Sequence, residues 1–545
     1  MPSRTVIDVL EHQGRPKLSR LVFQKPIRSR NIQEIPTMYR ALPTPEEMTR
    51  WDDSAQQEYG LLQELLMENA ARAALAVVLR EYGPVAGKQV VLLAGPGNNG
   101  GDAFALARLL ADHGALTSTF HVKSPAAYTG AAAYHLQLLN RLRLPLVPLP
   151  ETHIDHLSPP DILVDGLLGT GFQGELRDDY RLWIEYINRL PDRVFVLALD
   201  IPTGLNGLTG RPSPIAVKAT ATVSFQATKL GLAAPEAAAY IGREQARDIG
   251  IPFRVIQDQP PGQHLLEHGI LKRIPPADNL LHKGTAGHVL VAGGSPGLTG
   301  APLLTALAAL RCGAGLASVA CPARLTTEVK AGWPEVMLVP LGEGTTWSQE
   351  CAEDLAEVLP RFNALVLGPG LGRTPNLAEF CRALLQKNLP PLVGDADFLY
   401  TLARYPDLFG LLPADTILTP HPGEMAMLTG QTIAEVQADR IGTARKFARE
   451  KNVVLVLKGA GTIIASREGA VYVSPFACQN LAVGGSGDVL CGILGALLAA
   501  GLDPLTAANV AVYWHGRAGT ALQEGFPRRG NLAREIADIL PHVLH

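Results

Sequence analysis

Short, continuous apolar runs alternate with glycine-rich loops and helical patterns along most of the chain. Runs of this kind lie at 89–94, 162–165, 194–200, 220–225, 288–292, 364–367, 392–393, 416–418 and 453–457. They are typical of strands buried on both faces of a parallel sheet. Helical patterns occupy 44–82, 103–113 and 301–312, and another follows Gly487. The alternation predicts an α/β fold in which helices cover parallel strands.

The order of strand, glycine loop and helix starts twice, which predicts two domains. A chain of 545 residues is too long for one core, because domains usually hold about 150 residues. We expect a first domain at 38–256, a linker leading into the next domain at 257–285, and a second domain at 286–545. Residues 1–37 are polar and basic and predict an N-terminal extension with no core of its own. Asp8 and Glu11 argue against a targeting peptide, and Met38 is a possible alternative start.

Composition and charge exclude several classes of protein. Apolar residues make up 47% of the chain and charged residues 18%, which fits a globular protein rather than a disordered one. A net charge of −3 gives no basic excess for a nucleic-acid partner. The six cysteines form no Cys-x-x-Cys pair, so neither a zinc site nor a disulfide framework is predicted. No apolar run reaches the roughly 18 residues of a membrane span, and we expect a cytoplasmic protein.

Polar residues of the first half follow the ends of predicted strands. The run at 89–94 leads into a loop with Asn98, Asn99 and Asp102, and later strands end at Asp165 and Asp200. Thr203 follows Asp200 in a further loop. Ligands of open α/β sheets bind beyond the carboxyl ends of the strands, so Asn99, Asp165, Asp200 and Thr203 are expected to gather there. The alternative is that each aspartate merely caps its own turn.

The last glycine-rich loop of the second half lies at 484–487 and is followed by Asp488 and an apolar helix. Glycines and a helix N-terminus together bind anions, most often phosphate. A carboxylate beside phosphate is explained if Asp488 takes the proton of the group that receives a phosphoryl. The alternative is that Asp488 only caps the helix. The loop from Lys458 to Thr462 suits a nucleotide phosphate, whereas His421 alone would more often be a packed loop histidine.

The motifs of the second half, in their order, resemble the ribokinase-like fold and, within it, the ADP- or ATP-dependent NAD(P)H-hydrate dehydratases. They are Gly-Pro-Gly-Leu-Gly at 368–372, Asp-Ala-Asp at 395–397, Thr-Pro-His-Pro-Gly-Glu at 419–424, Lys-Gly-Ala-Gly-Thr at 458–462 and Gly-Gly-Ser-Gly-Asp at 484–488.

The first half resembles the NAD(P)H-hydrate epimerases, whose domain is Rossmann-like. Its motifs are Asn-Asn-Gly-Gly-Asp at 98–102, Val-Asp-Gly-Leu-Leu-Gly-Thr-Gly at 164–171 and Asp-Ile-Pro-Thr-Gly-Leu-Asn-Gly at 200–207. Both halves in this order resemble the bifunctional NAD(P)H-hydrate repair enzymes. The resemblance covers about residue 38 to the C-terminus.

For the first half, the resemblance implies an epimerase of the R and S hydrates of NADH and NADPH. Asp200 would lie at the reactive ring as the catalytic proton carrier, with Asp102 as its competitor. A potassium ion would be held by Asn99, Asp165 and Thr203, where the family more often has Ser at the third position. The substrate-binding residues would be Asn98, Asn99, Gly100, Gly101, Asp102, Gly169, Thr170, Gly171, Phe172, Gln173, Gly174, Glu175 and Asp200.

For the second half, the resemblance implies a dehydratase that consumes ADP or ATP, with Mg²⁺ accompanying the nucleotide, and with Asp488 as catalytic base. The hydrate would contact Ala301, Gly370, Gly372, His421 and Asp488. The nucleotide would contact Lys458, Gly459, Ala460, Gly461, Thr462 and Gly487. Ala103 and Ser486 stand where the family often has Gly and Thr. A homo-oligomer that binds only small molecules is expected.

Residue chemistry without the resemblance supports only phosphoryl transfer to a small hydroxylated molecule. The alternatives are therefore a ribokinase-like kinase that releases a phosphorylated product, and a first half that binds a ligand or partner without catalysis. Product analysis separates a dehydratase from a kinase, because a dehydratase regenerates NADH and releases free phosphate, whereas a kinase releases a phosphorylated compound.

A chain that begins at Met38 should keep both activities and nearly the same melting temperature. Residues 1–37 lie outside the resemblance and have too few apolar residues to bury a core. Thermal unfolding and activity of the shortened and full chains would test this. A drop of many degrees would mean that the extension docks on the fold.

Overall fold

A computed structural model describes residues 38–149, 157–172, 174, 176–276, 279–330 and 333–544. In the first half, a sheet of seven strands has the order β4-β3-β2-β5-β6-β7-β8, and every pairing in it is parallel. The strands are β2 (Gln89–Ala94), β3 (Leu116–His121), β4 (Leu146–Pro148), β5 (Ile162–Gly166), β6 (Phe195–Leu199), β7 (Ala221–Phe225) and β8 (Arg243–Arg247). The parallel order directs their carboxyl ends to one edge.

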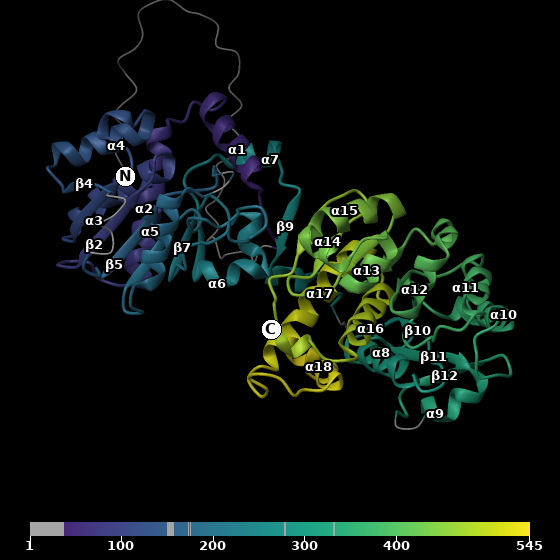
Figure 1. The fold of residues 1–545 in the computed structure, drawn as a ribbon. Helices are drawn as coiled ribbons and strands as arrows, with labels where there is room; N and C mark the ends of the chain where they lie inside the picture. Colours follow the sequence, from purple (N-terminus) through teal and green to yellow (C-terminus); the bar gives the residue numbers. More distant parts are fainter. Residues whose placement is uncertain are drawn as a thin grey trace, which may run out of the picture. The chain divides into compact units, whose positions relative to one another are not determined.

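Helices cover both faces of this sheet and bury it in two apolar clusters. One face packs against α2 and α3 with α4, and the other packs against Trp183 and Ile184 of α5 (Figure 1). Helix α1 begins with a capping box in which Thr44 and Glu47 bond each other's backbone N–H groups. The helices are α1 (Pro45–Gln57), α2 (Gln63–Glu81), α3 (Asn98–Asp112), α4 (Gly130–Arg141), α5 (Asp178–Arg189), α6 (Ala238–Ile241) and α7 (Phe253–Asp258).

The second half is built on a sheet of eleven strands with the order β1-β9-β18-β17-β16-β15-β14-β13-β10-β11-β12. The part from β16 to β12 is parallel, whereas β17 is antiparallel to both of its neighbours. The strands are β1 (Tyr39–Ala41), β9 (Gln263–Leu266), β10 (His288–Ala292), β11 (Leu316–Pro322), β12 (Met337–Leu341), β13 (Ala364–Leu367), β14 (Leu392–Gly394), β15 (Thr416–Leu418), β16 (Val454–Leu457), β17 (Ile463–Ala465) and β18 (Val471–Val473).

Two large apolar clusters lie on the two faces of this sheet. The first contains α8, α16, α17 and α18, and the second contains α10, α11, α12 and α15. The helices are α8 (Gly300–Arg311), α9 (Thr326–Lys330), α10 (Gln349–Val358), α11 (Leu377–Leu385), α12 (Asp397–Arg404), α13 (Pro422–Thr429), α14 (Ile433–Ala438), α15 (Arg440–Lys451), α16 (Ser486–Ala499), α17 (Pro504–Ala521) and α18 (Ala533–Ile539). No helix in the described ranges is both long enough and apolar enough to cross a membrane.

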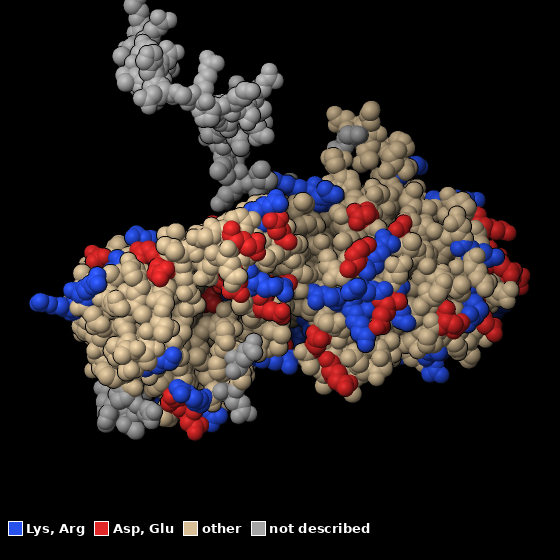
Figure 2. All heavy atoms as spheres, turned by 90° about the horizontal axis from the view of Figure 1, so that it is seen from above, with Lys and Arg blue, Asp and Glu red and all other residues tan. Residues whose placement is uncertain are grey.

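The charged side chains on the face drawn in Figure 2 are interspersed, with Lys and Arg beside Asp and Glu. This distribution agrees with a chain of 48 basic and 51 acidic residues. Neither sign dominates the face that is drawn.

The nine predicted strands are all present, and the structure adds several that the sequence analysis missed. Strand β3 was missed because its sequence, Leu-Thr-Ser-Thr-Phe-His, contains three hydroxyl residues and becomes buried only through its neighbours. The helical pattern at 44–82 is two helices, interrupted at 58–62. The segment 257–285, expected as a linker, contributes β9 to the larger sheet. Residues 1–37 lie outside the described residues.

Candidate active sites

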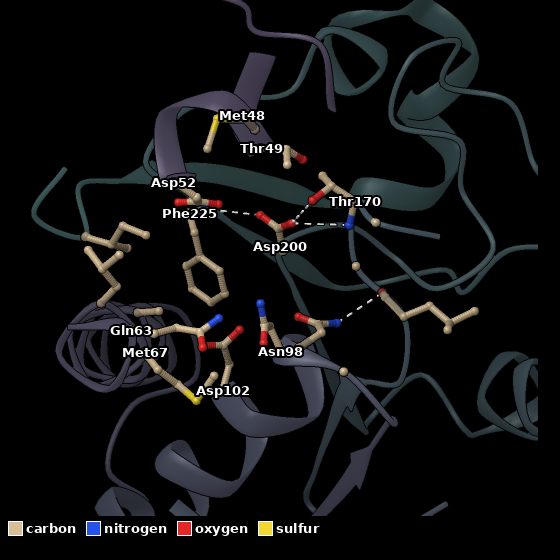
Figure 3. Close-up of a pocket in the computed structure, with 18 of the residues that line it drawn as sticks. Met48, Thr49, Asp52, Gln63, Met67, Asn98, Asp102, Thr170, Asp200 and Phe225 are labelled. Carbon is tan, nitrogen blue, oxygen red and sulfur yellow. Dashed lines mark hydrogen bonds between the residues drawn. The ribbon is translucent and has the colours of Figure 1, made fainter. Parts of the chain in front are cut away.

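A cavity of about 670 Å³ lies at the carboxyl ends of β2, β5 and β6 in the first half (Figure 3). Its walls come from α1, α2, the N-terminus of α3 and the loops after the strands. The lining includes Met48, Asp52, Asp53, Gln63, Met67, Asn98, Asn99, Asp102, Gly169, Thr170, Gly171, Phe172, Asp200, Phe225 and Lys229. The sequence predicted the α3 and loop members, but not the wall formed by α1 and α2.

Asp200 is held in this cavity by four donors. Its carboxylate accepts hydrogen bonds from the Thr170 hydroxyl at 3.1 Å, the Thr170 N–H at 3.4 Å and the Phe225 N–H at 3.3 Å. The ammonium of Lys229, only 1% exposed, forms an ion pair with the same carboxylate. Asp200 has φ +65°, a left-handed conformation that is uncommon for a residue with a side chain. Tertiary contacts therefore fix this carboxylate.

Lys229 was missed by the sequence analysis, although it follows a predicted strand as Asp200 does. Its Nζ also donates a hydrogen bond to the Phe225 carbonyl oxygen at 2.7 Å. A buried lysine normally needs such partners, because an unpaired charge is costly to remove from water. The only sequence signal was its place four residues after the end of a buried run.

Two further aspartates face the Asp200–Lys229 pair. Burial raises the pKa of Asp52 to about 6; Lys229 opposes this rise, and Asp200 adds to it. Burial, with Asp200 and Asp52 adding to it, raises the pKa of Asp102 well above its usual range. With a pKa of about 6, most Asp52 side chains are ionised at pH 7, whereas burial favours the neutral form of Asp102. Asp52 was missed because a lone acid on an amphipathic helix usually belongs to its solvated face.

Asn99, Asp165 and Thr203, predicted to hold a cation, are brought together below the cavity. The Thr203 hydroxyl donates to Asp165 at 2.6 Å, the Thr203 N–H donates to Asp165 at 2.8 Å, and Asn99 Nδ2 donates to the Leu168 carbonyl at 3.0 Å. Asn99 Oδ1 is buried without a hydrogen-bond partner. Such an orphaned oxygen in a cluster of oxygen donors fits a cation better than a closed hydrogen-bond network. Burial raises the pKa of Asp165 to about 6, and a bound cation would lower it.

The predicted glycines of the first half have different positions. Gly100 and Gly101 lie inside the first turn of α3, which begins at Asn98 rather than after the glycine loop. A Cβ at Gly100 would lie 2.0 Å from the Gly95 carbonyl oxygen, so this glycine allows close packing of the helix. Gly169 and Gly171 line the cavity, whereas Gly174 is exposed. Gln173 and Glu175 lie outside the described residues.

The second candidate site lies at the N-terminus of α16. Gly485, with φ +90°, is the N-cap, and Asp488 lies in the first turn without a side-chain capping bond. The alternative that Asp488 merely caps its helix is therefore wrong. Burial raises the pKa of Asp488 to about 7, with Asp395 adding to the rise and Lys458 opposing it. Ser486 is hydrogen-bonded at 3.2 Å to Nε2 of the buried His515, whose pKa burial lowers to about 4.

Lys458 lies directly over the glycine turn. Its Nζ is 2.7 Å from Asp395 and 3.8 Å from Glu424, and a Cβ on Gly487 would lie 3.3 Å from it. Burial alone would lower the pKa of Lys458, but the two carboxylates raise it above its usual range. Burial also raises the pKa of Glu424 to about 7, and Lys458 opposes this rise. The predicted phosphate lysine is therefore paired in the absence of a nucleotide.

The loop from Lys458 to Thr462 is supported by an arginine that the sequence analysis missed. Arg440, the first residue of α15, donates hydrogen bonds to the carbonyl oxygens of Ala460 at 2.6 Å and of Leu457 and Lys458 at 3.3 Å. The Thr462 hydroxyl donates to the Gly459 carbonyl at 2.9 Å. No local pattern marks Arg440, because it reaches the loop from a separate helix.

His421 is the N-cap of α13, where its Nδ1 accepts hydrogen bonds from Gly423 N–H at 3.0 Å and Glu424 N–H at 3.2 Å. The His421 ring therefore has the structural role expected of a packed loop histidine. About half of its side chain remains exposed. Ala301 lies in the first turn of α8. Gly370 and Gly372 have positive φ, and the Gly372 N–H donates to Asp397 at 2.9 Å.

Two family models match the chain. Residues 289–542 match the model described as NAD(P)H-hydrate dehydratase, and residues 63–231 match the one described as YjeF-related protein N-terminus. The chain is similar over its length to proteins named bifunctional NAD(P)H-hydrate repair enzyme. The one from Moorella thermoacetica is 37% identical, with 92% of this chain and 96% of that protein covered. The one from Escherichia coli is 32% identical, with 92% and 93% covered.

The chain is also similar to a solved structure of an ADP/ATP-dependent NAD(P)H-hydrate dehydratase from Bacillus subtilis, which was co-crystallized with ATP and Mg²⁺. The two are 29% identical with a TM-score of 0.42, and the alignment covers 50% of this chain and 95% of that one.

Replacing Lys229 with Met should destabilise the first half by about 3–5 kcal/mol at neutral pH, because Asp200 loses its buried counter-ion. Urea unfolding measures the loss. The double variant Lys229→Met/Asp200→Asn should lose less than the sum of the single variants, and the exposed Lys218→Met is the control. If the stability losses of the two single variants simply added in the double variant, Lys229 and Asp200 would not stabilise each other.

Proposed function

The chain belongs to the family of bifunctional NAD(P)H-hydrate repair enzymes, and we propose that its two halves divide the two reactions between them. Residues 38–256 interconvert the R and S hydrates of NADH and NADPH. Residues 286–545 dehydrate the S form at the expense of ADP or ATP, and residues 257–285 connect the two. The observation that carries this proposal is the placement of Asp488, which is free of capping bonds, beside a glycine turn and Lys458.

In the dehydratase half, Asp488 is the general base. It accepts the proton of the C6 hydroxyl of the hydrate while that oxygen attacks the terminal phosphoryl of the nucleotide. A pKa of about 7 suits this task, because the carboxylate is partly ionised at neutral pH and holds the proton once it has taken it. The ring nitrogen then expels phosphate, and loss of a proton from C5 restores the dihydronicotinamide.

The nucleotide lies on Lys458, Gly459, Ala460, Gly461, Thr462 and Gly487 in this proposal. The backbone N–H groups at the N-terminus of α16 stabilise the negative charge of the moving phosphoryl. Lys458 exchanges part of its pairing with Asp395 and Glu424 for the phosphate. Mg²⁺ bound with the nucleotide adds positive charge there. Ala301, Gly370, Gly372 and His421 surround the hydrate.

In the epimerase half, Asn98, Asn99 and Asp102 of α3 and the loop at 169–175 bind the dinucleotide. Asp200 lies at the reactive ring and carries a proton during ring opening and closure. Its carboxylate pairs with the Lys229 ammonium in a site that also holds Asp52 and Asp102. Gly100 allows α3 to pack against Gly95 after β2, and Gly101 allows it to pack against Met67 of α2 and Ala132 of α4.

A potassium ion in the first half is held by Asn99, Asp165 and Thr203. The unpartnered Oδ1 of Asn99 and an all-oxygen donor set with one carboxylate support a large monovalent cation. The cation would fix the loop after β5, because Asn99 and Thr203 both bond the backbone of Leu168. Cytoplasmic localisation and a homo-oligomeric state stay predictions from the sequence.

Replacing Asp488 with Asn should reduce dehydration by about 10²- to 10⁴-fold while nucleotide binding stays nearly unchanged. The reason is that Asp488 serves the hydroxyl, whereas Lys458 to Thr462 serve the nucleotide. Return of dihydronicotinamide absorbance from the S hydrate, together with calorimetric ATP binding, measures the two properties. Asp503→Asn at the N-terminus of α17 is the control. Near-normal turnover would contradict the role of Asp488, and a stable phosphorylated product would indicate a kinase.

Potassium should raise the melting temperature of the protein more than sodium at equal ionic strength, because only the larger ion matches the proposed oxygen set. Asp165→Asn should abolish the difference, since it removes the one carboxylate of the cluster. Crystals grown in potassium should show density with long contacts to Asn99, Asp165 and Thr203. Equal melting temperatures in both salts, with only water at the site, would contradict this assignment.

A further inference from the structure

Helix α1 places an aspartate, Asp52, in the wall of the first cavity. In Figure 3 Asp52 and Asp200 lie on one side of the cavity, and Asp102 and Asn98 of α3 lie on the other. Their electrostatic influence on one another agrees with this arrangement, because Asp200 and Lys229 act on Asp52, and Asp52 acts on Asp102. The cavity therefore has carboxyl groups on two walls.

The position of Asp52 is fixed by the attachment of α1. Trp51, the preceding residue, is 1% exposed, and its Nε1 donates a hydrogen bond to the Gln259 carbonyl at 2.9 Å. The capping box of Thr44 and Glu47 fixes the start of the helix. Just before it, the Pro43 carbonyl accepts from the Leu230 N–H at 2.9 Å, next to Lys229. Asp52 is thus held at the site by the N-terminus of its helix and by the neighbouring Trp51.

The hydrogen bonding of Asp52 and Asp200 is opposite in character. One carboxylate oxygen of Asp200 accepts hydrogen bonds from Thr170, and the other accepts them from Phe225 and Lys229. The Asp52 carboxylate accepts no hydrogen bond in the described part of the chain, although the Asp52 backbone carbonyl accepts one from Gln56. A carboxylate without donors in a cavity is free to accept a proton from a ligand. Asp52 is therefore available for proton transfer.

We propose that Asp52 is a second catalytic residue of the epimerase site and exchanges a proton with the bound hydrate. This assignment rests on the proposed function of the first half. Ring opening breaks the C6–N1 bond: the C6 hydroxyl loses its proton and becomes an aldehyde, while N1 keeps the electron pair and gains a proton. Closure on the other face reverses both transfers, so protons and electrons balance.

Two proton-transferring groups are needed, because the hydroxyl and N1 are different atoms and the hydroxyl changes face on inversion. Asp52 exchanges the proton of the C6 hydroxyl, and Asp200 with Lys229 exchanges the proton of N1. The charged groups that face Asp52 are Asp53 on its own helix, Asp200 at the end of β6, Lys229 after β7 and Asp102 on α3. Lys229 keeps Asp52 largely ionised at neutral pH, although burial raises the pKa of Asp52 to about 6.

The test uses the full-length chain with ATP and separate preparations of the R and S hydrates. Asp52→Asn should slow repair of the R hydrate toward its spontaneous rate, a loss of about 10²- to 10⁴-fold, because a general acid–base group is removed. Repair of the S hydrate should be unchanged, since it needs only the second half. Glu46→Gln removes a charge from the same helix at a side chain that is 84% exposed, and it should change neither rate.

Two further readouts separate proton transfer from a structural role. In the intact protein the epimerase rate should decrease as the pH is lowered through about 6, because Asp52 becomes protonated. This acidic limb of the pH–rate profile should be absent in Asp52→Asn. Formate should restore part of the R-hydrate rate in Asp52→Ala by occupying the vacated carboxylate position. A structural role would predict neither the lost limb nor the rescue.

The outcomes distinguish the two levels of the hypothesis. If the intact protein repairs the R hydrate only at the spontaneous rate, the epimerase function itself is wrong. If the intact protein is fast and Asp52→Asn is equally fast, Asp52 has no catalytic role. If Asp52→Asn is slow but formate does not rescue Asp52→Ala and the pH limb persists, the residue only shapes the cavity, and the proposal is wrong.

Discussion

A buried ion pair between a lysine and an aspartate stands at the centre of each candidate site. In the first half it joins Lys229 to Asp200, and in the second it joins Lys458 to Asp395. An unpaired charge in such places would cost several kcal/mol, and the opposite charge offsets that cost. The pair also allows further carboxyl groups to be buried nearby, because the lysine opposes the rise of their pKa values. Both sites concentrate acids in this way.

The remaining carboxyl groups differ in protonation because their surroundings differ. Burial raises the pKa of Asp102 well above its usual range, while Asp52 and Asp488 have pKa values of about 6 and 7. Groups in this range exchange protons readily at neutral pH, unlike an exposed aspartate with a pKa near 4. Burial supplies the rise, and the nearby lysine offsets part of it. The two sites therefore share one electrostatic principle while their chemistry differs.

Close helix packing decides where these groups lie in the second half. A Cβ at Gly492 would lie 2.3 Å from the Thr305 carbonyl oxygen, so α16 approaches α8 more closely than any other residue would allow. A Cβ at Gly495 would likewise lie 3.0 Å from Val289 on β10. This contact fixes α16 against the sheet and brings its first turn, with Asp488, to the loop of Lys458. Small residues inside the helix thus position the base.

The sequence by itself determined the fold class, the family and half of the strands in the described residues. Buried parallel strands need continuous apolar runs, and glycine loops must follow them where ligands approach, so both features are visible in the chain. It also placed Asn99, Asp165 and Thr203 at one edge, because parallel strands end together. Only the tertiary structure decided the partners of those residues. Lys229 and Arg440 act on residues 17 or more positions away, and such pairings leave no local pattern.

Asp52 shows the same limit most clearly. Along the sequence it is one acid on an amphipathic helix, and that position usually faces water. The anchoring of Trp51 at Gln259, more than 200 residues away, turns this face of α1 into the wall of a cavity. Burial then raises the pKa of a side chain whose chemistry is otherwise ordinary. Local pattern dictates which elements form, whereas packing between distant segments decides which side chains become reactive.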